Sequence, residues 1–157
     1  MILAIDPGTY ESAYLFWDTE KENIESMGIK KNDDVLKLLK DCGNILYPSY
    51  KFVIEMIESR GMPIGKETIE TIFWIGRFWE AFEGDKEDKE RVYRREVKLH
   101  FCGTVRATDA NIRQVLIDRF GGIQSTKKGG KLYGVKSHIW SALALALCHA
   151  EKTENRE

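Results

Sequence analysis

The N-terminal stretch MILAIDPGTYES constrains the fold of this 157-residue chain more than any other segment. An apolar run from Ile2 to Ile5 leads directly into Asp6, and the Pro7-Gly8-Thr9 sequence that follows is typical of a turn. A short apolar run bounded in this way predicts a strand that is buried on both faces. Asp6 then lies where the strand leaves the core, and a carboxylate there needs a metal ion or a hydrogen-bond donor as its partner. A turn in which Asp6 bonds only the following backbone is the simpler alternative.

Two more short strands and a helix are expected next. Residues 13–17 predict a strand antiparallel to the first, and residues 24–29 predict a third, so that the three strands form a meander. Asn32-Asp33-Asp34 offers an N-cap and an acidic first turn to a helix that Cys42-Gly43 would end.

The segment YKFVIEMI, residues 50–57, is a second apolar run, and Glu55 interrupts it much as Asp6 ends the first. Because this predicted strand follows a helix, we expect it to pair in parallel with the first strand, which would bring the two carboxylates together. Two such acids cannot both ionise cheaply without a cation between them, and Mg²⁺ is the ion that best suits oxygen ligands. The alternative is an ion pair between Glu55 and a nearby arginine such as Arg60.

The second half of the chain predicts more helix than strand. We expect helices over residues 66–82, from Thr108 to Phe120 and over residues 138–151, and a strand over EVKLHF, residues 96–101. The basic segment 123–136 is expected to be a loop that stays mobile until it meets a partner. Apolar residues cover more than one side of the helix over 66–82, so Trp74 and Trp79 predict contact with a second subunit, with stacking on nucleotides as the alternative.

Charge is unevenly distributed along the chain. The net charge is −1, yet residues 91–136 carry eleven basic and only three acidic side chains. This asymmetry is typical of a surface that binds a polyanion, although a solvated basic face without a partner has the same signature. The three cysteines lack metal-binding spacing, and neither a secretory leader nor a membrane-length apolar run is evident. We therefore expect one domain, residues 1–157, in the cytoplasm and without a membrane partner.

Four stretches taken together resemble a known family. They are ILAIDPGT, FVIEMIESRG, REVKLHFCGTVRATDANIRQVLIDRFGG and KSHIWSALALALCHA, and they span nearly the whole chain in family order. They resemble the RuvC-type Holliday junction resolvases of the RNase H-like superfamily, especially the divergent forms of bacteriophages and prophages. The resemblance implies an α/β RNase H-like fold, in which helices flank a mixed central sheet made of a three-strand antiparallel meander and parallel strands.

The same resemblance implies roles for individual residues. Asp6 matches the metal ligand of the first strand, and Glu55 matches the ligand between two ions, which would be Mg²⁺ with Mn²⁺ as a substitute. The family's last helix carries the pattern [D/H]-x-x-D-A-L-A, so His138 fits as a ligand or proton relay, whereas Ser141 stands where an aspartate is usual. Asp109 is the candidate acid that would compensate, at a position where related resolvases tend to have lysine. Solvent contact for His138 and a favourable charge at a helix start for Asp109 are the structural alternatives.

The function that follows is two-metal hydrolysis of phosphodiester bonds in branched or four-way DNA by a homodimer. The residues expected to contact phosphates are basic side chains of the second half: Lys98, Arg106, Arg113, Lys127, Lys128 and Lys131. A non-catalytic or weakly catalytic binder of branched DNA is the alternative, because Ser141 carries no charge. An actin-like nucleotide-binding module is a poor third hypothesis, since 157 residues cannot supply its two lobes.

Overall fold

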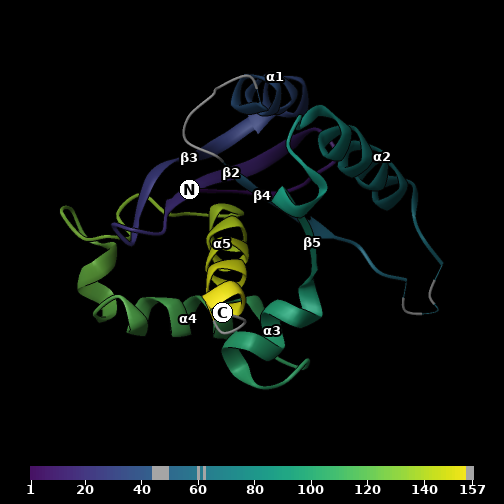
Figure 1. The fold of residues 1–157 in the computed structure, drawn as a ribbon. Coiled ribbons are helices and arrows are strands. Elements are labelled where there is room, and N and C mark those ends of the chain that lie inside the picture. The colour runs from purple at the N-terminus through teal and green to yellow at the C-terminus, as the bar shows by residue number, and fades with distance from the viewer. Residues whose placement is uncertain (44–49, 60, 62, 155–157) are drawn as a thin grey trace.

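A mixed five-stranded sheet forms the centre of the protein (Figure 1). The computed structural model describes residues 1–43, 50–59, 61 and 63–154. In the sheet order β3-β2-β1-β4-β5, the first three strands make an antiparallel meander, and β4 and β5 extend it in parallel with β1. The strands are β1 (Ile2–Asp6), β2 (Glu11–Asp18), β3 (Asn23–Lys31), β4 (Lys51–Met56) and β5 (Lys89–Tyr93). This architecture confirms the predicted meander and the predicted parallel pairing of β4 with β1.

The register between β1 and β4 brings the two strand-ending acids to the same edge of the sheet. Ile5 pairs with Ile54, so one further residue along each strand leads to Asp6 and Glu55. The strand carboxyl ends meet here because β1 and β4 are parallel.

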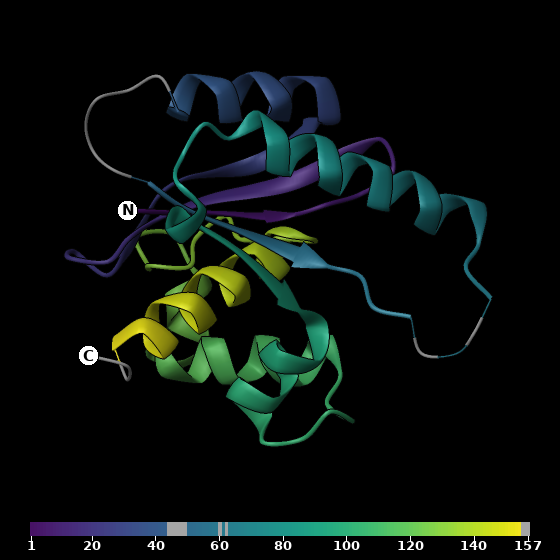
Figure 2. The same cartoon turned by 45° about the vertical axis from the view of Figure 1, so that its right-hand side comes forward.

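Helices cover both faces of the sheet (Figure 2). The first group, α1 (Asn32–Gly43) and α2 (Lys66–Ala81), lies on one face and shares a buried cluster with the sheet that includes Leu3, Phe52 and Phe78. The second group lies on the other face: α3 (Arg94–Cys102), α4 (Asp109–Arg119) and α5 (Ile139–Glu154). Two short 3₁₀ helices, η1 (Lys86–Asp88) and η2 (Gly122–Thr126), complete the chain.

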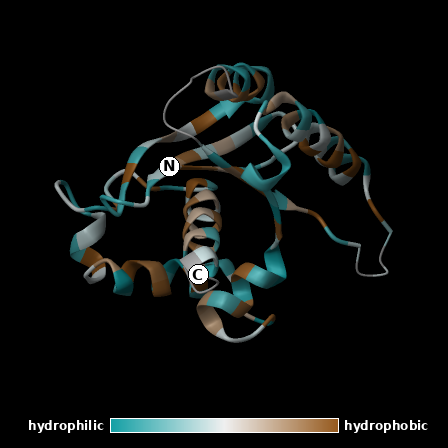
Figure 3. Ribbon diagram, in the orientation of Figure 1, coloured by the Kyte–Doolittle hydropathy of each residue, from teal (hydrophilic) through white to brown (hydrophobic). Residues whose placement is uncertain are grey.

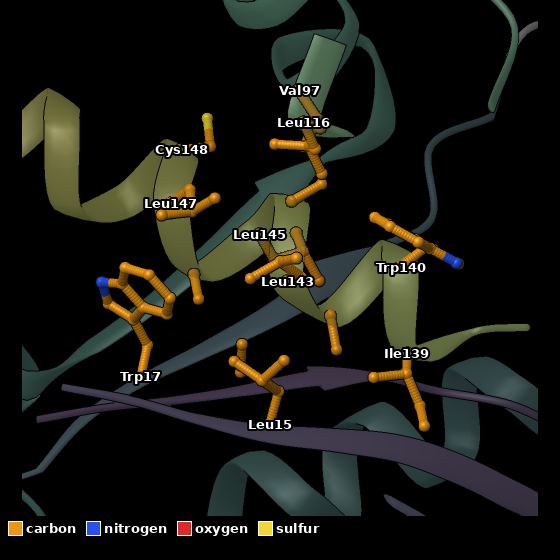
Figure 4. Packing of buried hydrophobic residues seen from close by; sticks show 14 of the residues in the cluster. Leu15, Trp17, Val97, Leu116, Ile139, Trp140, Leu143, Leu145, Leu147 and Cys148 are labelled. Atoms are coloured by element: carbon orange, nitrogen blue, oxygen red, sulfur yellow. The ribbon is translucent and has the colours of Figure 1, made fainter. Parts of the chain in front are cut away.

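The helix α5 is the central element of the second core. Residues 142–148 of this helix are all buried, and hydrophobic residues, brown in Figure 3, run along both the strands and α5. Figure 4 shows Leu143 of α5 beside Leu15 of β2, with Leu116 of α4 and Val97 of α3 on the far side of the helix. Alternating alanines let α5 approach the sheet closely, which fixes the position of its first turn. No helix within the described ranges is long and apolar enough to cross a membrane.

The predicted strand over residues 96–101 is wrong, because these residues lie in α3 and the strand β5 comes earlier, at Lys89–Tyr93. Val97 is buried, but Leu99 is 48% exposed, so the alternating apolar pattern does not mark one buried face. A capping box starts the helix instead, since Glu96 Oε1 accepts a hydrogen bond of 3.0 Å from the Tyr93 amide.

The basic segment 123–136, which was predicted to be a mobile loop, is packed against the core. Leu132 and Val135 are only 1% and 9% exposed and belong to the same cluster as α5. The Leu132 amide donates to the Ser125 carbonyl at 2.8 Å, which closes the segment on η2. These two apolar side chains anchor the segment, because their burial offsets the cost of ordering the loop.

Candidate active site

The turn after Asp6 is held rigidly by a buried asparagine from α1. Asn32 is 2% exposed. Its backbone N–H donates to the Tyr10 carbonyl at 3.0 Å, and its side-chain Nδ2 donates to the Gly8 carbonyl at 2.9 Å. Its Oδ1 accepts from Ser12 Oγ at 2.7 Å. Gly8 is required here, since a Cβ at that position would lie 2.3 Å from the Glu11 carbonyl oxygen. These contacts fix where the chain leaves β1 and therefore where Asp6 points.

Asp6 faces the start of α5. Its Oδ2 lies 2.9 Å from His138 Nδ1, and the Ser141 hydroxyl, three residues further along, is near enough to act on the pKa of this carboxylate. The Asp6 side chain is 12% exposed, whereas His138 is 75% exposed. Burial raises the pKa of Asp6 above its ordinary value, although His138, Arg94 and Ser141 all oppose that rise. Asp6 is thus bonded to α5, rather than engaged only with its own turn.

Glu55 is held by an arginine that sequence analysis missed. Arg94 Nη1 lies 3.4 Å from Glu55 Oε2; the two side chains are only 20% and 17% exposed. Burial raises the pKa of Glu55 to about 7, and the nearby Asp6 carboxylate also acts to raise it, while Arg94 opposes the rise. Arg60, the partner suggested as an alternative from the sequence, lies outside the described residues.

Arg94 also joins Asp109 to the site. Its Nη2 lies 2.5 Å from Asp109 Oδ1, and the Asp109 side chain is 75% exposed at the start of α4. Thr108 caps that helix, since its side-chain oxygen accepts a hydrogen bond from the Asn111 backbone N–H. Arg94 directly follows β5, whose last residue pairs with Met56 of β4. Had the sequence-based prediction placed this strand at residues 89–93, it would also have placed Arg94 at the same edge of the sheet as Asp6 and Glu55.

Two clefts flank the Asp6–His138 pair. One has a volume of about 330 Å³ and is lined by residues of α3, α4 and α5, among them Arg94, Asp109, Arg113 and His138. The other has a volume of about 300 Å³ and follows the turn from Asp6 to Glu11. His138 lines both clefts, so it stands at the point where they meet.

Of the six predicted phosphate-binding residues, only Arg113 lines the first cleft, with its guanidinium 4.9 Å from the Trp140 ring centroid. Lys131 does not line this cleft, and its Nζ donates to the Glu22 backbone carbonyl at 3.2 Å. Arg106, in the loop before α4, and Lys127 and Lys128, in the basic segment, are exposed, while Lys98 is half-buried. The structure therefore brings Asp6, Glu55, Asp109 and His138 to one edge of the sheet but spreads the basic residues more widely.

Asp6 and Glu55 offer a divalent cation two carboxylate ligands, which is an incomplete ligand set. Asp6 and Glu55 are largely buried carboxylates at the ends of neighbouring strands, and the charge of Asp6 disfavours ionisation of Glu55, so a cation between them would relieve the repulsion. Mg²⁺ is commonly held by one or two carboxylates together with water and substrate phosphates. Among the described residues, however, no group of three His, Cys, Asp or Glu side chains converges to hold an ion by itself.

Neither a family model nor a curated protein matches this sequence. Solved structures do match it, over nearly the whole chain. Thermus thermophilus RuvC in complex with a Holliday junction substrate is 17% identical, with a TM-score of 0.68 over 99% of this chain and 95% of that one. The same organism's RuvC in a second structure is 15% identical, with a TM-score of 0.69 over 99% and 96% of the two chains.

A Fowlpox virus resolvase bound to Holliday junction DNA is 14% identical, with a TM-score of 0.50 over 97% of this chain and 99% of that one. The chain therefore has the RuvC-like Holliday junction resolvase fold, a form of the RNase H-like fold, which confirms the fold class and the resemblance expected from the sequence. At these identities the likeness establishes the fold, and the chemistry has to be argued from the residues of this chain.

The raised pKa of Glu55 predicts an unusual dependence of stability on pH. In the folded protein Glu55 holds its proton up to about pH 7, whereas in the unfolded chain it loses that proton near its ordinary value of 4.5. The folded state therefore binds more protons between these values, and the free energy of unfolding should fall as pH rises through this window. Glu55→Gln should make the fall shallower in urea denaturation with EDTA present, whereas Glu70→Gln, an exposed change on α2, should not. An equally steep fall in Glu55→Gln would contradict the assignment.

Proposed function

We propose that this protein is a divalent-metal-dependent, structure-selective endonuclease that cuts Holliday junctions or other branched DNA. The observation that carries the proposal is the pair of largely buried carboxylates, Asp6 and Glu55, at adjoining ends of parallel strands, with Asp6 lining a cleft. Support comes from the fold of the matched structures, two of which are described as complexes with Holliday junctions. In this proposal residues 1–157 act as one nuclease domain in the cytoplasm of a bacterial or phage-infected cell.

Asp6 and Glu55 would hold the cation, Mg²⁺ or Mn²⁺. When bound, such an ion activates water and neutralises charge on the phosphate. For the second ion that the sequence predicts, the described residues offer no complete donor set. His138 uses Nδ1 on Asp6, which leaves Nε2 of its exposed ring to accept a proton from water or give one to the departing oxygen.

The second candidate function is binding of branched DNA with little or no cleavage. Ser141 supports it, because an uncharged hydroxyl lies near Asp6 where the family pattern has a charged ligand, and a hydroxyl is the poorer ligand for Mg²⁺. Arg94 then already balances part of the negative charge at the site.

The DNA would follow the first cleft towards the basic segment, residues 123–136. Arg113 is held at the cleft by its contact with Trp140, so it can present a fixed positive charge to a phosphate. Lys127 and Lys128 are exposed further along and would contact the backbone of a DNA arm. Lys98, Arg106 and Lys131 complete the proposed phosphate-binding set.

A homodimer would match the two-fold symmetry of a four-way junction, and α2 is the proposed interface. Trp74 and Trp79, chosen from the sequence, pack in their own chain: their ring centroids lie 5.7 Å from Phe78 and 6.2 Å from Phe52, respectively. The more exposed apolar residues of α2 are Ile69 and Phe73, at 57% and 63%. They lie four residues apart and thus on one face of the helix.

Removing either carboxylate should separate cleavage from binding. Asp6→Asn and Glu55→Gln should each lower the rate of junction cleavage in Mg²⁺ or Mn²⁺ by about 100-fold or more, because even outer-shell partners of metal ligands contribute about 10- to 100-fold. Junction affinity in a gel-shift assay should stay within a few-fold, and Asp41→Asn, an exposed change on α1, should leave both unaltered. Junction binding by the wild type without any cleavage would favour the second candidate function, and retained cleavage in Asp6→Asn would remove that residue from the site.

The basic segment should govern the salt dependence of DNA binding. A Lys127→Ala/Lys128→Ala double variant should weaken junction binding and lower the slope of log K against log salt by about two, since each lysine that neutralises a phosphate adds about one unit to that slope. A Lys37→Ala/Lys86→Ala variant, which removes the same charge outside the segment, should retain the wild-type slope. Equal slopes in all three proteins would exclude these lysines from the interface.

The α2 interface can be checked by sedimentation. Phe73→Ser should shift the protein from dimer to monomer, since it places a hydroxyl at the centre of the proposed apolar contact. Leu99→Ser on α3, which is 48% exposed, serves as the matched control and should remain dimeric. A monomeric wild type, or a dimeric Phe73→Ser protein, would contradict this interface.

A further inference from the structure

Arg94 stands where the acids of the site come together. Its two terminal nitrogens contact different carboxylates, Nη1 to Glu55 at 3.4 Å and Nη2 to Asp109 at 2.5 Å. It also lies close enough to Asp6 for the two charges to interact. A single guanidinium therefore balances acids from three different elements, namely β1, β4 and α4.

The backbone fixes the position of this guanidinium. Arg94 is the first residue of α3 and comes directly after β5, which is paired in parallel with the strand of Glu55. The Arg94 side chain is 20% exposed, and it lines the cleft of about 330 Å³ together with Arg113 and His138. Arginine stays charged at all physiological pH values and its planar donors match carboxylates and phosphates. It is thus a permanent positive charge at the site.

We propose that the Arg94 guanidinium takes the place of the second divalent cation, so that the DNA-free protein binds a single divalent ion. This inference rests on the proposed nuclease function and deepens it. A divalent ion bridging Glu55 and Asp109 would compete with Arg94 for the same oxygens. The guanidinium is covalently attached to the chain, whereas a free divalent ion has to lose part of its hydration shell before it binds. The guanidinium therefore occupies the position between Glu55 and Asp109.

Arg94 keeps donors for the substrate. The guanidinium has five N–H groups, and its contacts with Glu55 and Asp109 use only part of them. Arg94 lines the cleft, where its remaining N–H groups would donate to a phosphate oxygen and stabilise the charge that develops on it during cleavage. Asp109 then acts as a positioning residue, because its contact with Nη2 orients the guanidinium.

Isothermal titration with Mn²⁺ alone, without DNA, tests the assignment independently of activity. The wild type should bind one ion per chain. Arg94→Met, which removes the charge but keeps similar bulk, should bind a second ion, because Glu55 and Asp109 are then left without a cation. Arg94→Lys, which keeps a positive charge, should still bind one. Circular dichroism checks that each variant is folded.

Arg95 provides the matched control. It is the next residue of α3, and its Nε lies 3.3 Å from Glu58, so Arg95→Met removes an arginine from the same turn without touching the site. That variant should bind one ion, like the wild type. Two ions in the wild type, or one ion of unchanged affinity in Arg94→Met, would overturn the assignment of Arg94 while leaving the nuclease proposal intact. An absence of Mn²⁺ binding in every protein would overturn both.

Discussion

The cost of holding two largely buried carboxylates side by side is the constraint on which the rest of this site depends. Asp6 and Glu55 lie at the ends of neighbouring parallel strands; burial raises the pKa of both, and the charge of Asp6 raises the pKa of Glu55 further. Two neighbouring segments supply groups that offset this cost. His138, which directly precedes α5, contacts Asp6, and the start of α3 contributes Arg94 to Glu55. The fold assembles a negative site together with its counter-charges.

The hydrophobic cores hold these groups in place. The buried residues 142–148 fix α5 against the sheet, which sets the height of His138 above Asp6. The Asn32 hydrogen bonds fix the turn on the other side of Asp6. Cleavage requires reacting groups held to within a fraction of an ångström, so this rigid support is what the proposed chemistry needs.

The sequence predicted what depends on local pattern and missed what depends on sheet position. Asp6 and Glu55 could be found because each ends an apolar run, and parallel pairing of the two strands followed from the intervening helix. Arg94 could not be found, because KERVY contains only one buried apolar residue, Val92, and reads as polar. The apolar alternation over 96–101 then drew the strand to the wrong place, where a capping box in fact begins a helix. One misplaced strand concealed the main counter-charge of the site.

If one divalent cation binds between Asp6 and Glu55, anomalous diffraction from crystals grown with Mn²⁺ should reveal it. We expect a single strong anomalous peak between the two carboxylates, with the guanidinium of Arg94 still in contact with Asp109. No peak at that position at saturating Mn²⁺ and a pH above about 7, where Glu55 is ionised, would contradict it.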